Sequence, residues 1–379
     1  MKTASLSSLL KHLESLPDPR HQRNRKHLLV DVVAIAVCGV LVGCDGPTAI
    51  RLWAEQREDW LRGFLALPAG LPSKDCLRRV LSRLKPDAFA KCFAQWVAEG
   101  LARDGEGRLI AIDGKTLRRS HDKKNALGPL HVVSAWASEA GFSLGQLATD
   151  EKSNEITAIP ELLDAIDLED AVVTIDAMGC QKEIAEKIVK EKGDYVLALK
   201  GNHEKLHVAV IEHFVALHER SLEGTDCRRR QTQGRGHGRV ERREYYQTPL
   251  PDSIKPLAAG WKGLKTIGQV VSITERDGKE TSEVRYYLSS LSPGVKRFAE
   301  AVRGHWAIEN SLHWVLDVTF REDESRSRDR RLAENLAALR RLAIGLLKQH
   351  PSKHSLKSKQ RIAGWNVDFL TQVLALQTT

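Results

Sequence analysis

A stretch of the sequence between Val302 and Glu324 concentrates residue types that take part in chemistry. It reads VRGHWAIENSLHWVLDVTFREDE, and its apolar residues recur at the spacing of a helix. Glu309 lies in its middle, with His305 and His313 four residues to either side, which predicts all three on one face of a helix, about a turn apart. A carboxylate and two imidazoles in this arrangement are more than the packing of an ordinary core helix requires.

Two strand-like segments upstream each end in an aspartate. Residues 108–113 read RLIAID and residues 171–176 read AVVTID, so Asp113 and Asp176 each follow a run typical of a buried strand. Two carboxylates on neighbouring strands repel each other unless they are protonated or a cation neutralises them. With Glu309 they predict an all-oxygen site for Mg²⁺, with Mn²⁺ as a substitute. Two such ions about 4 Å apart would stabilise the attacking and leaving oxygens of a phosphoryl transfer.

Simpler interpretations stay open on the residues alone. A strand-end aspartate can merely cap the turn that follows it. The face formed by His305, Glu309 and His313 could instead hold zinc, although it lacks the adjacent glutamate of the H-E-x-x-H metalloprotease motif. Otherwise the two histidines orient Glu309 or contact phosphate, while Trp306 and Trp314 pack or stack on bases.

Basic residues gather at several places where a polyanion could bind. The chain has 58 Lys+Arg against 49 Asp+Glu, a net charge of +9, which is compatible with a nucleic-acid partner without requiring one. Residues 235–243, RGHGRVERR, have the composition of a phosphate-binding loop, and equally that of a solvated hairpin tip. The predicted DNA-contacting residues are Lys115, Arg118, Arg119, Lys200, Asn202, His203, Arg235, His237, Arg239, Arg303, His305, Trp306, Asn310, His313 and Trp314.

The composition is that of a globular protein. Of the 379 residues, 42% are hydrophobic and 28% charged. The six cysteines are scattered without a C-x-x-C pair, which argues against a zinc ribbon and a disulfide framework and favours a reducing cytoplasm. The apolar run 28–43 is interrupted by Asp31 and is shorter than the roughly 20 residues of a membrane-spanning helix, so we expect a buried helix in a soluble protein.

The order of elements predicts an α+β chain that begins with an all-helical domain. Apolar spacing and proline breaks predict helices over 4–16, 28–43, 50–65, 73–84 and 86–100. After these we expect strands over 108–113, 130–138, 142–149, 171–176 and 194–199, with helices over 159–166 and 182–192. This is the order of a ribonuclease-H-like core, although many α/β folds would satisfy it.

A mainly β insertion is expected to interrupt this core. Residues 205–222 have a helical pattern, and strands are expected over 264–272 and 284–289, with a hairpin turn signal at Asp277–Gly278 between the two. A helix over 293–320 carries Glu309, and a basic stretch follows it. The predicted domains are 1–103 (helical, for DNA-end binding or dimerisation), 104–203 (core, first part), 204–291 (β insertion), 292–349 (core, last part) and 350–379 (basic tail).

Three segments together carry a family resemblance. They are IAIDGKTLRRS, TIDAMGCQKEIAEKI with YVLALKGNH, and RGHWAIENSLHWVLDVTFREDESRSR. Over nearly its whole length the chain resembles bacterial insertion-sequence transposases of the DDE superfamily, in the branch that includes the H-repeat-associated proteins. The resemblance makes Asp113 the first D, Asp176 the second D and Glu309 the E. In the superfamily signature Tyr-x-x-Arg-x-x-x-Glu-x6-Lys, His305 stands at the Arg position and Leu316 at the Lys position.

The resemblance implies a fold, an activity and partners. The fold is a ribonuclease-H-like domain with a β insertion before the last catalytic helix. The activity is divalent-metal-dependent hydrolysis of phosphodiesters at transposon ends, followed by strand transfer into target DNA, by a homodimer on paired terminal inverted repeats in a bacterial cytoplasm. The alternatives are a site-specific endonuclease that does not join strands and a relic that binds the ends without cutting them.

Overall fold

The computed structural model describes residues 6–100, 108–122, 125–149, 155–236 and 238–374. Contacts divide the chain into two compact units, one made of residues 1–105, 114–158 and 307–379 and the other of 106–113 and 159–306. The division passes through β1 (Leu109–Thr116), α7 (Glu155–Asp164) and α10 (Val295–Ile308), each of which is continuous across it. The domain limit predicted between residues 103 and 104 lies outside the described residues.

The first unit contains the helices that the N-terminal sequence predicts. The apolar run forms α2 (Leu29–Leu41), which is buried along almost its whole length. The helix expected over 50–65 is divided in two, because the chain turns between Glu55 and Glu58. No helix in the described ranges is long and apolar enough to cross a membrane. The N-terminal helices are α1 (Leu6–Glu14), α2, α3 (Pro47–Glu55), α4 (Glu58–Arg62), α5 (Lys74–Leu81) and α6 (Pro86–Gly100).

The basic C-terminal stretch folds as helices. α12 (Arg330–Gln349) is a core helix: most of its residues are buried, including Arg340 and Arg341. Both guanidinium groups lie beside the buried carboxylate of Glu322, whose single negative charge offsets part of their two positive charges. The segment expected as a tail contains α13 (Leu356–Trp365) and α14 (Val367–Leu374).

The strands form one mixed sheet in the order β3-β2-β1-β4-β5-β9-β8-β7-β6. β1, β4 and β5 run parallel, whereas β2 and β3 are antiparallel to each other. The expected ribonuclease-H-like class, with its helical N-terminal region, is confirmed by this order of strands and helices. The core strands are β1, β2 (His131–Ala137), β3 (Phe142–Thr149), β4 (Val172–Ile175) and β5 (Asp194–Leu199), and α8 (Lys182–Lys190) connects the last two.

The β insertion continues the core sheet within the second unit. β9 pairs antiparallel with β5, and the three remaining strands follow outward from it. The turn predicted at Asp277–Gly278 is confirmed: both residues have positive φ, 52° and 74°, as a two-residue hairpin requires. The strands are β6 (Arg228–Gly236), β7 (Arg239–Pro249), β8 (Thr266–Arg276) and β9 (Lys279–Ser289), preceded by α9 (Glu204–Glu219).

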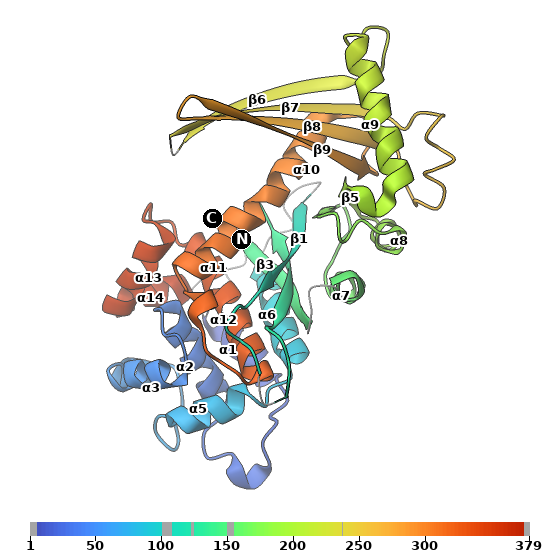
Figure 1. Cartoon of the computed structure of the whole chain (residues 1–379). Helices are drawn as coiled ribbons and strands as arrows, with labels where there is room; N and C mark the ends of the chain where they lie inside the picture. The colour runs from blue at the N-terminus through green and yellow to red at the C-terminus, as the bar shows by residue number, and fades with distance from the viewer. Residues whose placement is uncertain (1–5, 101–107, 123–124, 150–154, 237, 375–379) are drawn as a thin grey trace. The chain divides into compact units, whose positions relative to one another are not determined.

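Side chains that alternate along β9 pack against two different helices. Tyr286 meets Phe214 of α9, which lies across the strands of the insertion (Figure 1). The next residue, Tyr287, meets Phe298 of α10 edge-on, with ring centroids 5.6 Å apart. Because successive strand residues point to opposite faces, α9 and α10 cover opposite sides of this part of the sheet. The α10 side is a buried apolar cluster that includes Tyr245, Tyr287 and Phe298.

Gly268 lets α10 lie close to β8. A Cβ at this position would overlap the ring of Phe298. We therefore expect Gly268→Ala to lower the free energy of unfolding by about 1–3 kcal/mol, the usual cost of overpacking a core. Calorimetry should show a lower melting temperature. Gly234→Ala on β6, where an added Cβ meets nothing within 4 Å, is the matched control. Equal melting temperatures for the two variants would contradict this account of how α10 is seated.

Candidate active site

The register of two parallel strands puts two of the predicted acids side by side. Ile112 on β1 is paired with Ile175 on β4. Asp113 and Asp176 follow these residues directly, at the carboxyl ends of adjacent parallel strands, where α/β sheets commonly bind ligands. Both residues are partly buried.

The third predicted acid begins an irregular turn of its helix. α10 ends at Ile308, residues Glu309–His313 form one π-helical turn, and α11 (Trp314–Val318) continues from there. The helical segment therefore runs from Val295 to Val318, interrupted by the π turn, where a single helix over 293–320 was expected. Single π turns within α-helices are rare and are frequent at functional sites. The extra residue in the turn alters the helical spacing between Glu309 and His313, whose side chains nevertheless meet, with Nδ1 of His313 3.4 Å from Oε2 of Glu309.

The two histidines take different partners. The Nδ1 of His305 is hydrogen-bonded to the hydroxyl of Thr174 on β4 at 3.1 Å. The Nδ1 of His313 lies 3.4 Å from Oε2 of Glu309, and its ring is buried while the glutamate side chain is 62% exposed. Among the described residues, His305 does not belong to the group that lies at mutual ligand distance, whereas Glu309 and His313 do.

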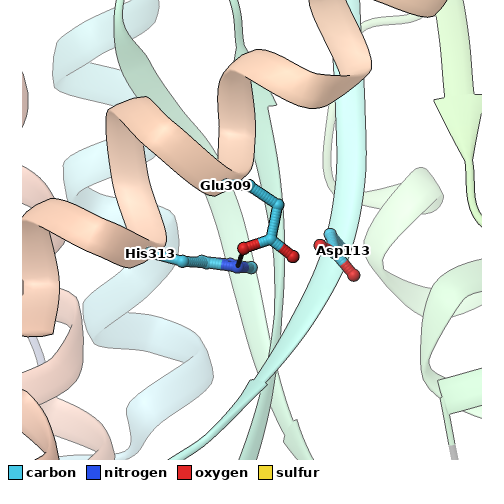
Figure 2. A group of neighbouring side chains, drawn as sticks. All are labelled: Asp113, Glu309 and His313. Carbon is cyan, nitrogen blue, oxygen red and sulfur yellow. Dashed lines mark ion pairs between the residues drawn. The ribbon is translucent and has the colours of Figure 1, made fainter. Parts of the chain in front are cut away.

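Asp113, Glu309 and His313 come together as a group with ligand chemistry. Each offers one ligand atom, and these atoms lie within 4.8 Å of one another. Figure 2 shows Glu309 and His313 on the same helical segment, turned toward the strand that carries Asp113. Ligands on opposite sides of a Mg²⁺-sized ion are about 4 Å apart, because each bond is about 2.1 Å. Two carboxylates and an imidazole at this spacing fit a divalent cation after small side-chain adjustments.

Asp176 is not in this group, and its carboxylate is tied to the turn after β4. Its Oδ1 accepts the backbone N–H of Met178 at 3.0 Å and that of Gly179 at 3.4 Å. The capping interpretation that the sequence left open therefore describes this oxygen. Two residues predicted to contact DNA brace the same turn: Asn202 donates to the carbonyl of Ala177 at 2.8 Å, and His203 donates to that of Cys180 at 2.7 Å. Asp176 thus stands on a firmly held loop beside Asp113.

The other face of β1 rests on a buried histidine–glutamate pair that the sequence analysis did not identify. His131 on β2 and Glu155 at the start of α7 are hydrogen-bonded, and their side chains are only 2% and 3% exposed. The other ring nitrogen of His131 is hydrogen-bonded to the hydroxyl of Thr116 at 2.9 Å. A Cβ on Gly114 would overlap both His131 and Glu155, so only glycine fits directly after Asp113. The sequence feature that could have pointed to this packing is Gly114, directly after Asp113.

Comparisons with known proteins agree with this architecture. The profile described as "Transposase DDE domain" matches residues 104–346, and one described as "DDE_Tnp_1-associated" matches residues 10–97. The chain belongs to the DDE transposase family. It is 40% identical to "Putative transposase YncI" of Escherichia coli O157:H7, over 98% of this chain and 95% of that protein. It is 38% identical to "H repeat-associated putative transposase YhhI" of Escherichia coli K12, over 98% of each.

The chain is also similar to a solved structure, the cryo-EM structure of the piggyBac transposase synaptic complex with hairpin DNA. It covers 99% of this chain and 83% of its own, at 12% identity and a TM-score of 0.43. Membership of the DDE transposase family, shown by the sequence matches, makes the chain an enzyme and implies a divalent metal ion. The grouped acids are where such an ion fits.

The residues predicted to contact DNA fall into two sets. Some are already engaged: Lys115 is buried among acids, and Trp306 lies under the guanidinium of Arg285 at 4.2 Å. The segment 235–243 forms the end of the β6–β7 hairpin rather than a separate loop, and His237 lies outside the described residues. Other members are exposed, although Arg118, Asn202 and Arg239 also have partners within the chain. The exposed members are Arg118, Arg119, Lys200, Asn202, Arg235, Arg239, Arg303, Asn310 and Trp314.

The His131–Glu155 pair gives a prediction about stability. His131→Leu leaves the carboxylate of Glu155 buried without a partner, which should lower the free energy of unfolding by about 3–5 kcal/mol. Adding Glu155→Met removes that charge and should restore much of the loss. Urea unfolding measures both. Lys192→Met breaks the exposed Lys192–Glu169 pair and serves as control, with little expected change in the free energy of unfolding. A double variant less stable than His131→Leu would contradict the proposed burial of charge.

Proposed function

We propose that this chain is a DNA transposase that hydrolyses phosphodiester bonds at the ends of its own element and then joins the freed 3′ ends to target DNA. Asp113, Asp176 and Glu309 are its catalytic acids. The observation that supports this most is the approach of Asp113 and Glu309 to within ligand distance, with Asp176 at the neighbouring strand end. Acids on two parallel strands and a later helix give a divalent ion ligands from three separate segments of the chain.

We propose that the three acids would hold two Mg²⁺ ions, for which Mn²⁺ could substitute. When bound, such ions lower the charge on the phosphoryl oxygens and help generate the nucleophile. The chain's own residues orient the ligands. His313 lies against Glu309 and restrains its carboxylate, and the N–H groups of Met178 and Gly179 hold Asp176. His313 also offers a ring nitrogen within 4.8 Å of the ligand oxygens of Asp113 and Glu309, so it could itself act as a ligand.

Exposed basic and aromatic side chains would hold the DNA. Arg118 and Arg119 follow β1, Arg303 lies on α10, and Trp314 on α11 is 58% exposed. Arginines bind phosphate oxygens, and an exposed indole can stack on a base. Binding should weaken steeply as salt concentration rises, because phosphate contacts release counterions. Terminal inverted repeats are the proposed specific substrate, and a homodimer on two paired ends the proposed assembly.

The three acids give the central test. Asp113→Asn, Asp176→Asn and Glu309→Gln should each reduce Mg²⁺-dependent nicking of DNA that carries the element's terminal repeats by about 100-fold to 10,000-fold, because metal ions contribute several kcal/mol to such reactions. Glu300→Gln, on the same α10 and paired with Arg297, is the matched control and should nick normally. Three acid variants that all nick like the wild type would refute the assignment.

The products of the same assay separate the alternatives. A transposase yields nicked ends and also molecules in which those ends are joined to target DNA. An endonuclease on this fold yields nicked products alone. A relic binds the repeats with or without metal and yields neither. The acids present at all three positions favour turnover over the relic.

A further inference from the structure

Lys115 is a buried cation surrounded by acids. Its side chain is 8% exposed, and its Nζ donates to Oδ1 of Asp323 at 2.9 Å. The same Nζ lies 2.8 Å from Oδ1 of Asp317, as an ion pair, and 3.8 Å from Oε2 of Glu322. Lys115 follows Asp113 by two residues on β1, whereas Asp317 lies on α11, in the segment directly after Glu309 and His313. One ammonium group therefore joins the strand of the first acid to the helix of the last.

The chain makes a bend that brings the second acid back to this lysine. After α11 the backbone passes through Arg321 in the left-handed region, at φ 51°. Non-glycine residues adopt this conformation uncommonly, and it persists where surrounding contacts impose it. The bend leads into a short 3-10 turn, Glu322–Glu324, that carries Asp323. Behind it Glu322 is fully buried and pairs with Arg341 at 3.2 Å. The turn that carries Asp323 is thus itself tied to α12 through Glu322.

Strand alternation explains why Lys115 faces this way. Asp113 and Lys115 point to one side of β1, toward Glu309 and toward Asp317 of α11 respectively. Gly114 and Thr116 point to the other side, toward His131. A shift of β1 by one residue would exchange the two sets. The ion pairs of Lys115 are therefore linked to the side on which the Asp113 carboxylate emerges.

We propose that Lys115 is a positioning residue, which holds the end of β1 against α11 so that Asp113 and Glu309 stay close enough to share a divalent cation. This inference rests on the proposed function for the role of the two acids. It replaces the DNA contact that the sequence predicted for Lys115, since an ammonium held by two carboxylates in a buried site does not reach a phosphate. A lysine suits the position because a compact point charge fits among several carboxylates.

The direction in which metal affinity changes when Lys115 is replaced distinguishes a positioning role from a purely electrostatic one. Removing a cation near two carboxylates should, by charge alone, strengthen their binding of a metal ion. Losing a positioning contact should weaken it. Lys115→Met therefore has opposite expected effects under the two accounts. Lys115→Met combined with Asp317→Asn removes one charge of each sign, so the charge effect largely cancels and the loss of positioning remains.

The experiment measures Mn²⁺ affinity of the full chain without DNA, by electron paramagnetic resonance. Positioning predicts that Lys115→Met, alone and with Asp317→Asn, weakens Mn²⁺ binding by roughly 10-fold or more, as loss of an outer contact at a metal site typically does. Affinity for DNA and its salt dependence should match the wild type. Arg235→Met is the matched opposite: Arg235 is exposed on β6, a strand that carries none of the acids that hold Lys115, and its loss should weaken DNA binding while leaving Mn²⁺ affinity unchanged.

Several outcomes would overturn the proposal. Tighter or equal Mn²⁺ binding in both Lys115 variants refutes positioning. Weaker DNA binding with normal Mn²⁺ affinity would make Lys115 a DNA contact after all. If the double variant loses Mn²⁺ affinity only in proportion to the fraction unfolded, judged by circular dichroism at the same temperature, the lysine is merely structural. If Lys115→Arg binds Mn²⁺ as tightly as the wild type and the double variant binds it more weakly, the result supports a positioning role that needs a cation at residue 115.

Failure of the proposed function gives a different pattern. If wild-type protein and Asp113→Asn bind Mn²⁺ equally, the metal-binding role of the acids is wrong, whatever Lys115 does. Lys115 is then tested by amide hydrogen exchange. Positioning predicts that the amides of residues 115 and 116 exchange roughly 10-fold faster in the folded double variant than in the wild type, as local opening requires. Unchanged exchange there would refute it independently.

Discussion

Mutual repulsion of like charges is the constraint on which this site depends. Asp113 and Glu309 are useful for metal binding only if their carboxylates stay close, yet without a cation each disfavours the ionised form of the other. Free side chains would move apart. The scaffold must therefore fix the backbone of both, and β1 is fixed from its two faces. His131 and Glu155 pack under Gly114 and Thr116, while the other face is held through Lys115.

The sheet supplies the rest of this rigidity. Asp113 and Asp176 are neighbours because β1 and β4 pair in register, which the hydrogen-bonded ladder determines along its length. The insertion adds four antiparallel strands to the same sheet instead of forming a separate body. Within the second unit α10 is seated on these strands through Phe298 and passes close over Leu109 of β1 at Gly304. The insertion therefore helps to position the helix that leads to Glu309.

Much of the fold follows from local patterns in the sequence. The helix over 86–100 and the strand over 194–199 have the predicted limits, because apolar periodicity and a flanking proline or glycine define both. β6 could not be predicted in this way. It is exposed along nearly its whole length, so no alternation of apolar and polar residues marks it, and its arginine-rich sequence resembles a loop. β1 extends past its expected end for a related reason: Lys115 and Thr116 are polar but find partners from distant segments.

In the candidate site, too, the residues marked by local sequence properties were predicted and those that depend on tertiary contacts were not. Asp113, Asp176 and Glu309 were identified from their places after strands and within a helix, and these are local properties. The contact of His313 with Glu309 was among the expectations, whereas the partner of His305, Thr174 on β4, was not identified, because it lies on a segment distant in sequence. The contribution of His131 and Glu155 was missed because neither residue belongs to a recognisable motif, and their pairing depends on a tertiary contact between β2 and the start of α7.

Charge alone could not separate two kinds of basic residue in this chain. Lys115, Arg340 and Arg341 are buried beside Glu322, where each cation stabilises a carboxylate that would otherwise be costly to bury. Arg118, three residues beyond Lys115, is mostly exposed. Both kinds raise the net charge equally, so composition assigns them all to a polyanion. Only the exposed kind can meet a phosphate without breaking the scaffold. The basic excess of the chain therefore overstates the surface available to a polyanion, because part of it lies buried against carboxylates.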